Sequence, residues 1–101
     1  MIIESIVSTV SKRRSVNFAP FGIRKEKKEI IISPYIPSIT LQNLRSNKCA
    51  VVNYIEDASF YVNCILGKKK FKKEKAEKIC GFYLKETISF DEVVVQKIIE
   101  N

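Results

Sequence analysis

Apolar and polar positions alternate over much of the first half of the chain, which predicts β-strands joined by short polar turns. The segment 2–10 is rich in β-branched residues and predicts the first strand. Further strands are predicted over 16–23, 29–33 and 49–55. Charged turns at 11–15 and 24–28 link the first three strands, so we expect antiparallel pairing rather than a sheet in which a helix follows every strand.

Two short helices are predicted in the middle of the chain. The first has Ser38 as its candidate N-cap and Asn47 as a plausible end. The second is predicted from Asp57, as its cap, through Leu66, with Gly67 ending it.

The last third of the chain has less regular patterning. The segment 68–78 is strongly basic and predicts either a solvated helix or a loop, and 79–90 predicts one long strand. The segment 91–101 fits a strand or a helix face equally. The order of elements predicts one mainly β domain over 1–101, an antiparallel barrel with short peripheral helices.

The net charge of +7 on 101 residues implies an attraction to anions, which include phosphates, nucleic acid and acidic membrane surfaces. The chain contains no histidine. This excludes Ser-His-Asp triads, Cys-His pairs and zinc-histidine sites, so chemistry must use other side chains or a cofactor.

Three cysteines, Cys49, Cys64 and Cys80, are widely spaced and form no CxxC pair, so neither a zinc site nor a redox dithiol is predicted. Their odd number and the lack of a signal peptide predict reduced thiols and a cytoplasmic protein. No apolar run is long enough to span a bilayer, so no membrane partner is expected.

The first candidate site is the segment from Asn17 to Gly22. Small Ala19, a ladder broken at Pro20 and the bare backbone of Gly22 would let a flat ring approach Phe21 and its neighbours closely. The alternative is a β-bulge or sheet edge that helps to close a barrel, and the residues alone favour this structural interpretation.

The second and third candidates contain hydroxyl and amide side chains. Ser38, Thr40 and Asn43 lie at the start of the predicted helix, where unpaired N–H groups suit a phosphate. Taken alone, the pattern favours plain N-capping by Ser38. Asn53 lies on the apolar face of its predicted strand, so its buried amide needs hydrogen-bond partners. It either bonds the edge of a ligand ring or ties down a neighbouring loop.

The lysine run 68–78 is typical of a solvated face. Nucleic-acid binding would be better supported by aromatic residues interleaved with the lysines, and only Phe71 lies inside the run.

Taken together, three segments resemble the flavin-reductase-like, FMN-binding split-barrel superfamily. They are SIVSTV…SVNFAPFGI, SPYIPSITLQNL and AVVNYIED, and the resemblance extends through Gly67. More narrowly, they look like archaeal and bacterial proteins of unknown function in that superfamily. The order and spacing of the three segments carry the resemblance more than any one of them.

The resemblance implies a split β-barrel that binds FMN at or near the interface of a homodimer. It assigns the isoalloxazine ring to one segment, namely Asn17, Ala19, Pro20, Phe21 and Gly22. It assigns the phosphate to Ser38, Thr40 and Asn43, and the ring or ribityl chain to Asn53. Ser33 and Ile39 stand where it would place basic residues, so the phosphate would lack two charge-assisted bonds.

Three functions follow as hypotheses. The first is an FMN-dependent oxidoreductase or flavin reductase with a nicotinamide donor, in which the flavin accepts hydride. The second is a non-catalytic flavin-binding or flavin-free split-barrel protein, motivated by the missing basic residues. The third is a small basic β-barrel that binds nucleic acid, motivated by the charge.

Overall fold

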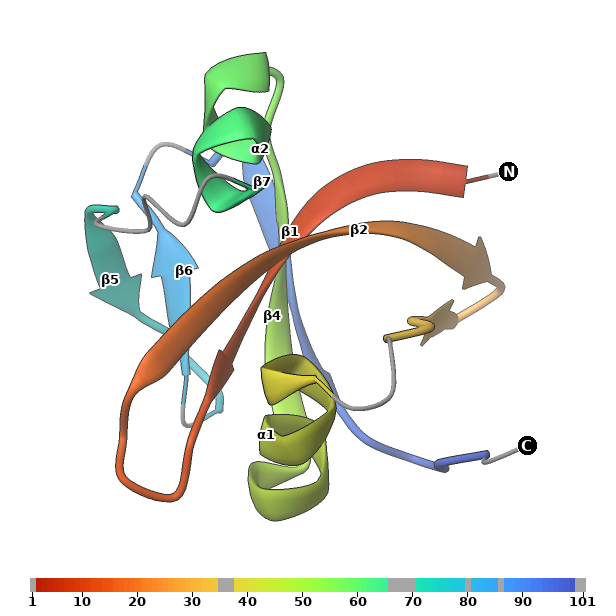
Figure 1. The fold of residues 1–101 in the computed structure, drawn as a ribbon. Coiled ribbons are helices and arrows are strands. Elements are labelled where there is room, and N and C mark those ends of the chain that lie inside the picture. The colour runs from red at the N-terminus through yellow and green to blue at the C-terminus, as the bar shows by residue number, and fades with distance from the viewer. Residues whose placement is uncertain (1, 35–37, 66–70, 80, 86, 100–101) are drawn as a thin grey trace.

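A computed structural model of the chain describes residues 2–34, 38–65, 71–79, 81–85 and 87–99. Figure 1 shows its elements in chain order. They are β1 (Ile2–Val10), β2 (Val16–Glu26), β3 (Glu29–Ile31), α1 (Ile39–Asn47), β4 (Cys49–Tyr54), α2 (Ala58–Ile65), β5 (Lys73–Lys75), β6 (Phe82–Leu84) and β7 (Ser89–Val94). The prediction of a mainly β fold with short helices is confirmed.

The main sheet is antiparallel, with the strand order β3-β2-β1-β4-β7. β1 and β2 pair in one unbroken register from Ile2 opposite Arg24 to Val10 opposite Val16. The predicted bulge at Pro20 is therefore wrong, but the alternative of a sheet edge holds. Among the described residues β3 pairs with β2 only along 24–26, which leaves Pro20 beside an open edge, where proline is tolerated.

The sheet curls into a half-barrel (Figure 1). A cluster of hydrophobic side chains packs on each of its faces. Neighbouring strand residues point to opposite faces, and this alternation separates the two clusters. The inner cluster includes Leu44 of α1 and consists of Val7, Ile23, Leu44, Ala50 and Val52. The outer cluster includes residues of α2 and β6 and consists of Ile6, Phe18, Ile55, Cys64 and Leu84. Helix α1 therefore lies on the inner face, and α2 with the β5–β6 hairpin lies on the outer face.

Both helices begin where their capping residues predicted. Ser38 has an extended backbone, and its hydroxyl oxygen accepts the N–H of Leu41 at 3.1 Å. Asp57 accepts the N–H of Ser59 at 2.9 Å, and this bond lowers the pKa of its carboxyl. Helix α1 ends at Asn47, as predicted, and Lys48 caps it with a left-handed backbone and an N–H that donates to the carbonyl of Leu44. The predicted stop at Gly67 lies outside the described residues.

The prediction of one long strand over 79–90 is wrong. Residues 82–84 form β6 and pair with β5, whereas β7 begins at Ser89 and pairs with β4. Between the two strands the N–H of Thr87 donates to the carbonyl of Leu84 at 3.1 Å. The carbonyl oxygen of Tyr54 then holds the residues just before β7. The N–H of Ile88 and the hydroxyl of Thr87 both donate to that oxygen at 3.0 Å.

The basic segment 68–78 was expected to be a helix or a loop. In its described part, residues 73–75 form strand β5 instead, because β6 offers an edge for pairing. In the segment 91–101, for which a strand and a helix were both considered, the residues up to Val94 belong to strand β7. Residues 95–99 have no regular secondary structure. Within the described ranges, neither helix is long and apolar enough to cross a membrane.

Candidate functional site

The first turn of α1 lies against β2 on the inner face of the half-barrel. The side-chain amide of Asn17 donates to the hydroxyl oxygen of Thr40 at 3.3 Å. Thr40 is only 2% exposed, and its hydroxyl oxygen accepts this bond. The bond joins two candidate segments that are separated by 23 residues in the sequence.

Three backbone N–H groups of α1, those of Ile39, Thr40 and Leu41, precede the first backbone hydrogen bond of the helix, and the Ser38 hydroxyl oxygen accepts the last of them. The first backbone bond runs from the N–H of Gln42 to the carbonyl of Ser38 at 3.1 Å. The N–H groups of Ile39 and Thr40 therefore have no acceptor within the helix. The side chain of Ile39 is 59% exposed, and N–H groups at the start of a helix attract anions.

Asn43 has a different environment from Thr40, although both are buried on the same helix. Its amide donates to the hydroxyl oxygen of Thr9 at 3.0 Å, and its side chain is 4% exposed. This bond fastens α1 to β1. The predicted phosphate contact of Asn43 stays a prediction.

Strand β2 divides its five candidate residues between the two faces. Asn17, Ala19 and Phe21 point to the inner face, where Phe21 packs against the inner cluster. Pro20 points to the outer face and lines a hollow beside α2. Gly22 shares that outer face, and a Cβ at this position would come within 2.7 Å of the Ile2 side chain.

Asn53 lies on the outer face and is fully buried. Its amide donates to the carbonyl of Ile6 at 2.9 Å and to the hydroxyl of Ser8 at 3.3 Å. Its carbonyl oxygen accepts the N–H of Leu84 at 2.8 Å. The second interpretation of Asn53, that it ties down a neighbouring segment, matches this geometry, and a flavin contact stays a prediction.

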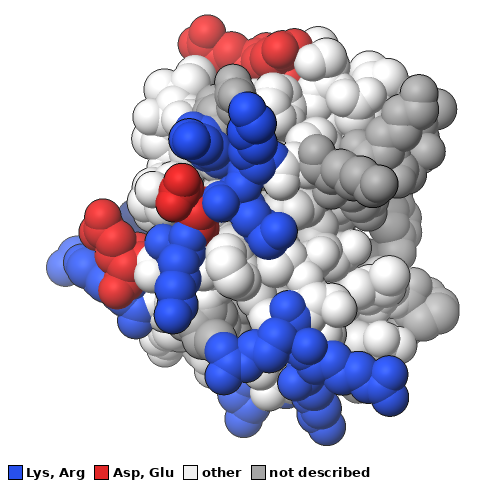
Figure 2. All heavy atoms as spheres, turned by 90° about the vertical axis from the view of Figure 1, so that its left-hand side faces the viewer, with Lys and Arg blue, Asp and Glu red and all other residues white. Residues whose placement is uncertain are grey.

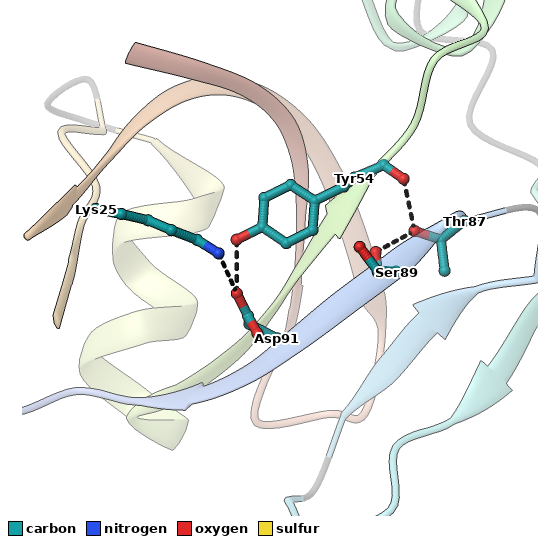
Figure 3. Close-up of polar contacts among 5 residues, drawn as sticks. All are labelled: Lys25, Tyr54, Thr87, Ser89 and Asp91. Carbon is teal, nitrogen blue, oxygen red and sulfur yellow. Dashed lines mark hydrogen bonds and ion pairs between the residues drawn. The ribbon is translucent and has the colours of Figure 1, made fainter. Parts of the chain in front are cut away.

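A polar cluster that the sequence did not suggest lies further along the inner face (Figure 3). The Lys25 ammonium lies 2.9 Å from Asp91 Oδ2, and the Tyr54 hydroxyl donates to the same oxygen at 2.7 Å. The ammonium also lies 4.6 Å from the centroid of the Tyr54 ring. Because β2 and β7 are separated by two strands, these contacts require the curl of the sheet.

The pKa values of the three side chains favour a cationic lysine, a neutral tyrosine and an anionic aspartate. The hydrogen bond with Tyr54, followed by that with Asp91, raises the pKa of Lys25. Desolvation raises the pKa of Tyr54. Desolvation also acts to raise the pKa of Asp91, but the bonds from Tyr54 and Lys25 outweigh it, so the pKa of this carboxyl lies below its usual value.

A family model described as the N-terminal domain of DUF447, a protein of unknown function, matches residues 3–101. This chain belongs to the DUF447 family. A search of curated proteins found no match for this DUF447 domain. Solved structures give three relatives with the same curled half-barrel, which is that of the FMN-binding split-barrel proteins.

The three relatives differ in their distance from this DUF447 domain. An FMN-bound DUF447 protein of Methanosarcina mazei is 28% identical, with a TM-score of 0.69 over 88% of this chain and 48% of its own. The 2-nitrobenzoate 2-nitroreductase of Pseudomonas fluorescens is 19% identical, with a TM-score of 0.82 over 95% of this chain and 54% of its own. The flavoredoxin of Desulfovibrio vulgaris is 13% identical, with a TM-score of 0.81 over 98% and 62%. The chain thus spans about half the length of the first two.

The inner face of this DUF447 domain has donors that fit a phosphate ester. They are the Thr40 hydroxyl and the first N–H groups of α1, and all of them are neutral. Ile39 and Ser33 are exposed, so the positions where the resemblance places basic residues are accessible but uncharged. Next to these donors, half-buried Ala19 presents a side chain small enough for a flat ring to approach.

Proposed function

We propose that this chain binds FMN on the inner face of its half-barrel and serves as the flavin-binding part of an oxidoreductase or flavin reductase. The observation that carries this proposal is the hydrogen bond from Asn17 to Thr40, which places the strand segment expected at the ring beside the helix end expected at the phosphate. The FMN-bound protein of Methanosarcina mazei supports the choice of cofactor.

In this proposal the chain positions the cofactor and excludes water from it. The N–H groups of Ile39 and Thr40, together with the Thr40 hydroxyl, bind the phosphate. Ala19 and Phe21 form the apolar floor below the ring, and Asn17 holds the Thr40 oxygen. FMN, when bound, supplies hydride chemistry, and a nicotinamide is the proposed donor. No side chain is needed as a general base, which agrees with the absence of histidine.

The functional unit is proposed to be a homodimer with the cofactor at or near its interface. The half-barrel of one chain leaves large apolar side chains in solvent, and Ile65 and Ile99 are about three-quarters exposed, at 76% and 74%. Association with a second copy would cover part of this surface.

The proposal is tested by titrating FMN into the protein and recording the visible absorption of the flavin after unbound FMN is removed. Thr40→Ala removes the hydroxyl and is expected to weaken FMN binding by about tenfold, the loss of one hydrogen bond to a charged group. Thr40→Ser keeps the hydroxyl and should bind nearly normally. Ser46→Ala removes an exposed hydroxyl from the other end of α1 and serves as the control.

Two results would change the proposal. Equal FMN affinity in Thr40→Ala and the unaltered protein would show that the phosphate lies elsewhere. Retained FMN without oxidation of NADH or NADPH would favour the non-catalytic flavin-binding alternative, which the uncharged Ile39 and Ser33 motivate.

A further inference from the structure

Basic side chains outnumber the acidic ones that lie among them on one face of the molecule, over the β1–β2 turn and the β5–β6 hairpin (Figure 2). We call this surface the basic face. Its members are exposed in the structure, and they are Lys12 and Arg13 of the turn and Lys73 and Lys75 of the hairpin. Lys72 and Lys85 continue the ladder of the hairpin on the side of Tyr83. The turn and the hairpin are about 60 residues apart in sequence, so the fold is what brings the two groups of charges together.

The β5–β6 hairpin also places an aromatic ring among these charges. Lys75 pairs directly with Phe82, and the Lys73 ammonium lies 5.8 Å from the centroid of the Phe82 ring. Phe82 is half-buried, so the protein does not enclose this residue fully. Tyr83 points to the opposite face of the hairpin, beside Glu74, and its ring stacks on Phe90.

Phe71, the aromatic residue inside the lysine run, does not lie among the exposed basic side chains as Phe82 does. Phe71 packs against the outer cluster, and its ring lies 5.3 Å from that of Phe60 and 5.4 Å from that of Phe18. The ring that accompanies the lysines therefore comes from β6, which only the strand pairing reveals.

We propose that the basic face binds single-stranded nucleic acid, with the lysines and Arg13 on phosphates and a base stacked on Phe82. Single-stranded nucleic acid is recognised by a positively charged surface that follows the backbone and by aromatic rings that stack on bases. An acidic protein or an anionic membrane would match the charge alone, whereas Phe82 adds a partner that suits a flat base. This inference does not depend on flavin binding.

The test uses fluorescence anisotropy of a labelled single-stranded RNA of about 12 nucleotides, a length within the usual range of such sites. Lys12→Glu with Arg13→Glu is expected to weaken binding by more than tenfold, because it reverses two phosphate contacts. Arg24→Glu with Lys28→Glu gives an equal change in net charge at the other end of β2 and should change affinity little. Binding of the unaltered protein should fall with salt, with a log–log slope of about −3 if four side chains contact phosphates.

The stacking contribution is tested by Phe82→Leu, with Tyr83→Leu on the opposite face of the hairpin as the control. Stacking predicts a loss of about five- to tenfold for Phe82→Leu and little loss for Tyr83→Leu, provided that both variants keep their melting temperatures.

Three outcomes would overturn the inference. They are the absence of RNA binding at low salt, an equal loss in the two charge-reversal variants, and equally tight binding of polyglutamate or of vesicles rich in anionic lipid. The visible absorption of added FMN, measured on the same samples, reports on the flavin proposal separately.

Discussion

At the scale of single residues, Asn53 shows how one side chain can be essential to a fold without being part of a binding site. Its side-chain amide donates a hydrogen bond to the backbone of β1, and its side-chain oxygen accepts the N–H of Leu84. Asn53 therefore joins the main sheet to the β5–β6 hairpin. An apolar strand face with one buried amide predicted that such partners exist. It did not identify them, because Leu84 lies 31 residues away.

Replacing Asn53 should therefore destabilise the protein strongly. Asn53→Ala leaves the buried N–H of Leu84 without an acceptor and removes the bonds to β1, so we expect a loss of about 3 kcal/mol in the free energy of unfolding. Urea denaturation measures this loss, and Gln96→Ala at an exposed position is the control. A change below about 1 kcal/mol would mean that water replaces the lost bonds.

Ile39 offers a gain of function at the same scale. Its side chain is 59% exposed beside the proposed phosphate site, so Ile39→Arg should cost little stability. A charge-assisted bond to phosphate is expected to tighten FMN binding by about tenfold. Gln42→Arg, at an exposed position on the same helix, is the control, and an equal gain in both variants would indicate only a general charge effect.

At the scale of elements, the contacts among Lys25, Tyr54 and Asp91 link β2, β4 and β7 across the curled sheet. No local pattern could have predicted them. Lys25 lay in a predicted turn and Asp91 in an ambiguous tail, and their contact depends on strand order and curl.

These contacts predict a pH dependence of stability. Folding lowers the pKa of Asp91 from its usual value of 3.8. The charged carboxylate therefore stabilises the fold fully at pH values above 3.8, and this stabilisation is lost as the pH falls through the lowered pKa of the folded protein. The side chains of Lys25 and Asp91 are 43% and 42% exposed, so solvent screening limits the contribution to less than about 1 kcal/mol.

Asp91→Asn should therefore lower the urea midpoint at neutral pH, and the difference from the unaltered protein should shrink at an acid pH below the lowered pKa of Asp91. Glu26→Gln, an exposed carboxylate on β2, is the control. An equal difference at both pH values would mean that the substitution acts through packing rather than through charge.

The elements themselves were predicted well where the signals were local. Strand β1, the two helix starts and β4 follow from β-branched residues and from the caps Ser38 and Asp57. The segment 79–90 was not predicted, because its division into β6 and β7 depends on acceptors at Asn53 and Tyr54. Such remote partners leave no periodic pattern in the segment that they divide.

At the scale of the whole molecule, the curled sheet leaves apolar side chains exposed to solvent. That residues 1–101 form a single domain stays a prediction. We expect the protein to have about twice its chain mass of 11.6 kDa by light scattering after size exclusion. If FMN binds at the interface, adding it should raise the dimer fraction on dilution, because the ligand stabilises the assembly that binds it. A monomer at all concentrations, with FMN bound, would contradict the dimer.

The bonds of Asn53 also have a consequence for the order in which the chain folds. They join residues separated by 47 and 31 positions, whereas β1 and β2 meet across the short turn 11–15. Closing a short loop costs less entropy, so we expect the β1–β2 hairpin to form before the Asn53 bonds. Asn53→Ala should then speed unfolding in stopped-flow urea experiments and leave the folding rate nearly unchanged. A slower folding rate would mean that β6 docks on the sheet before the main barrier is crossed.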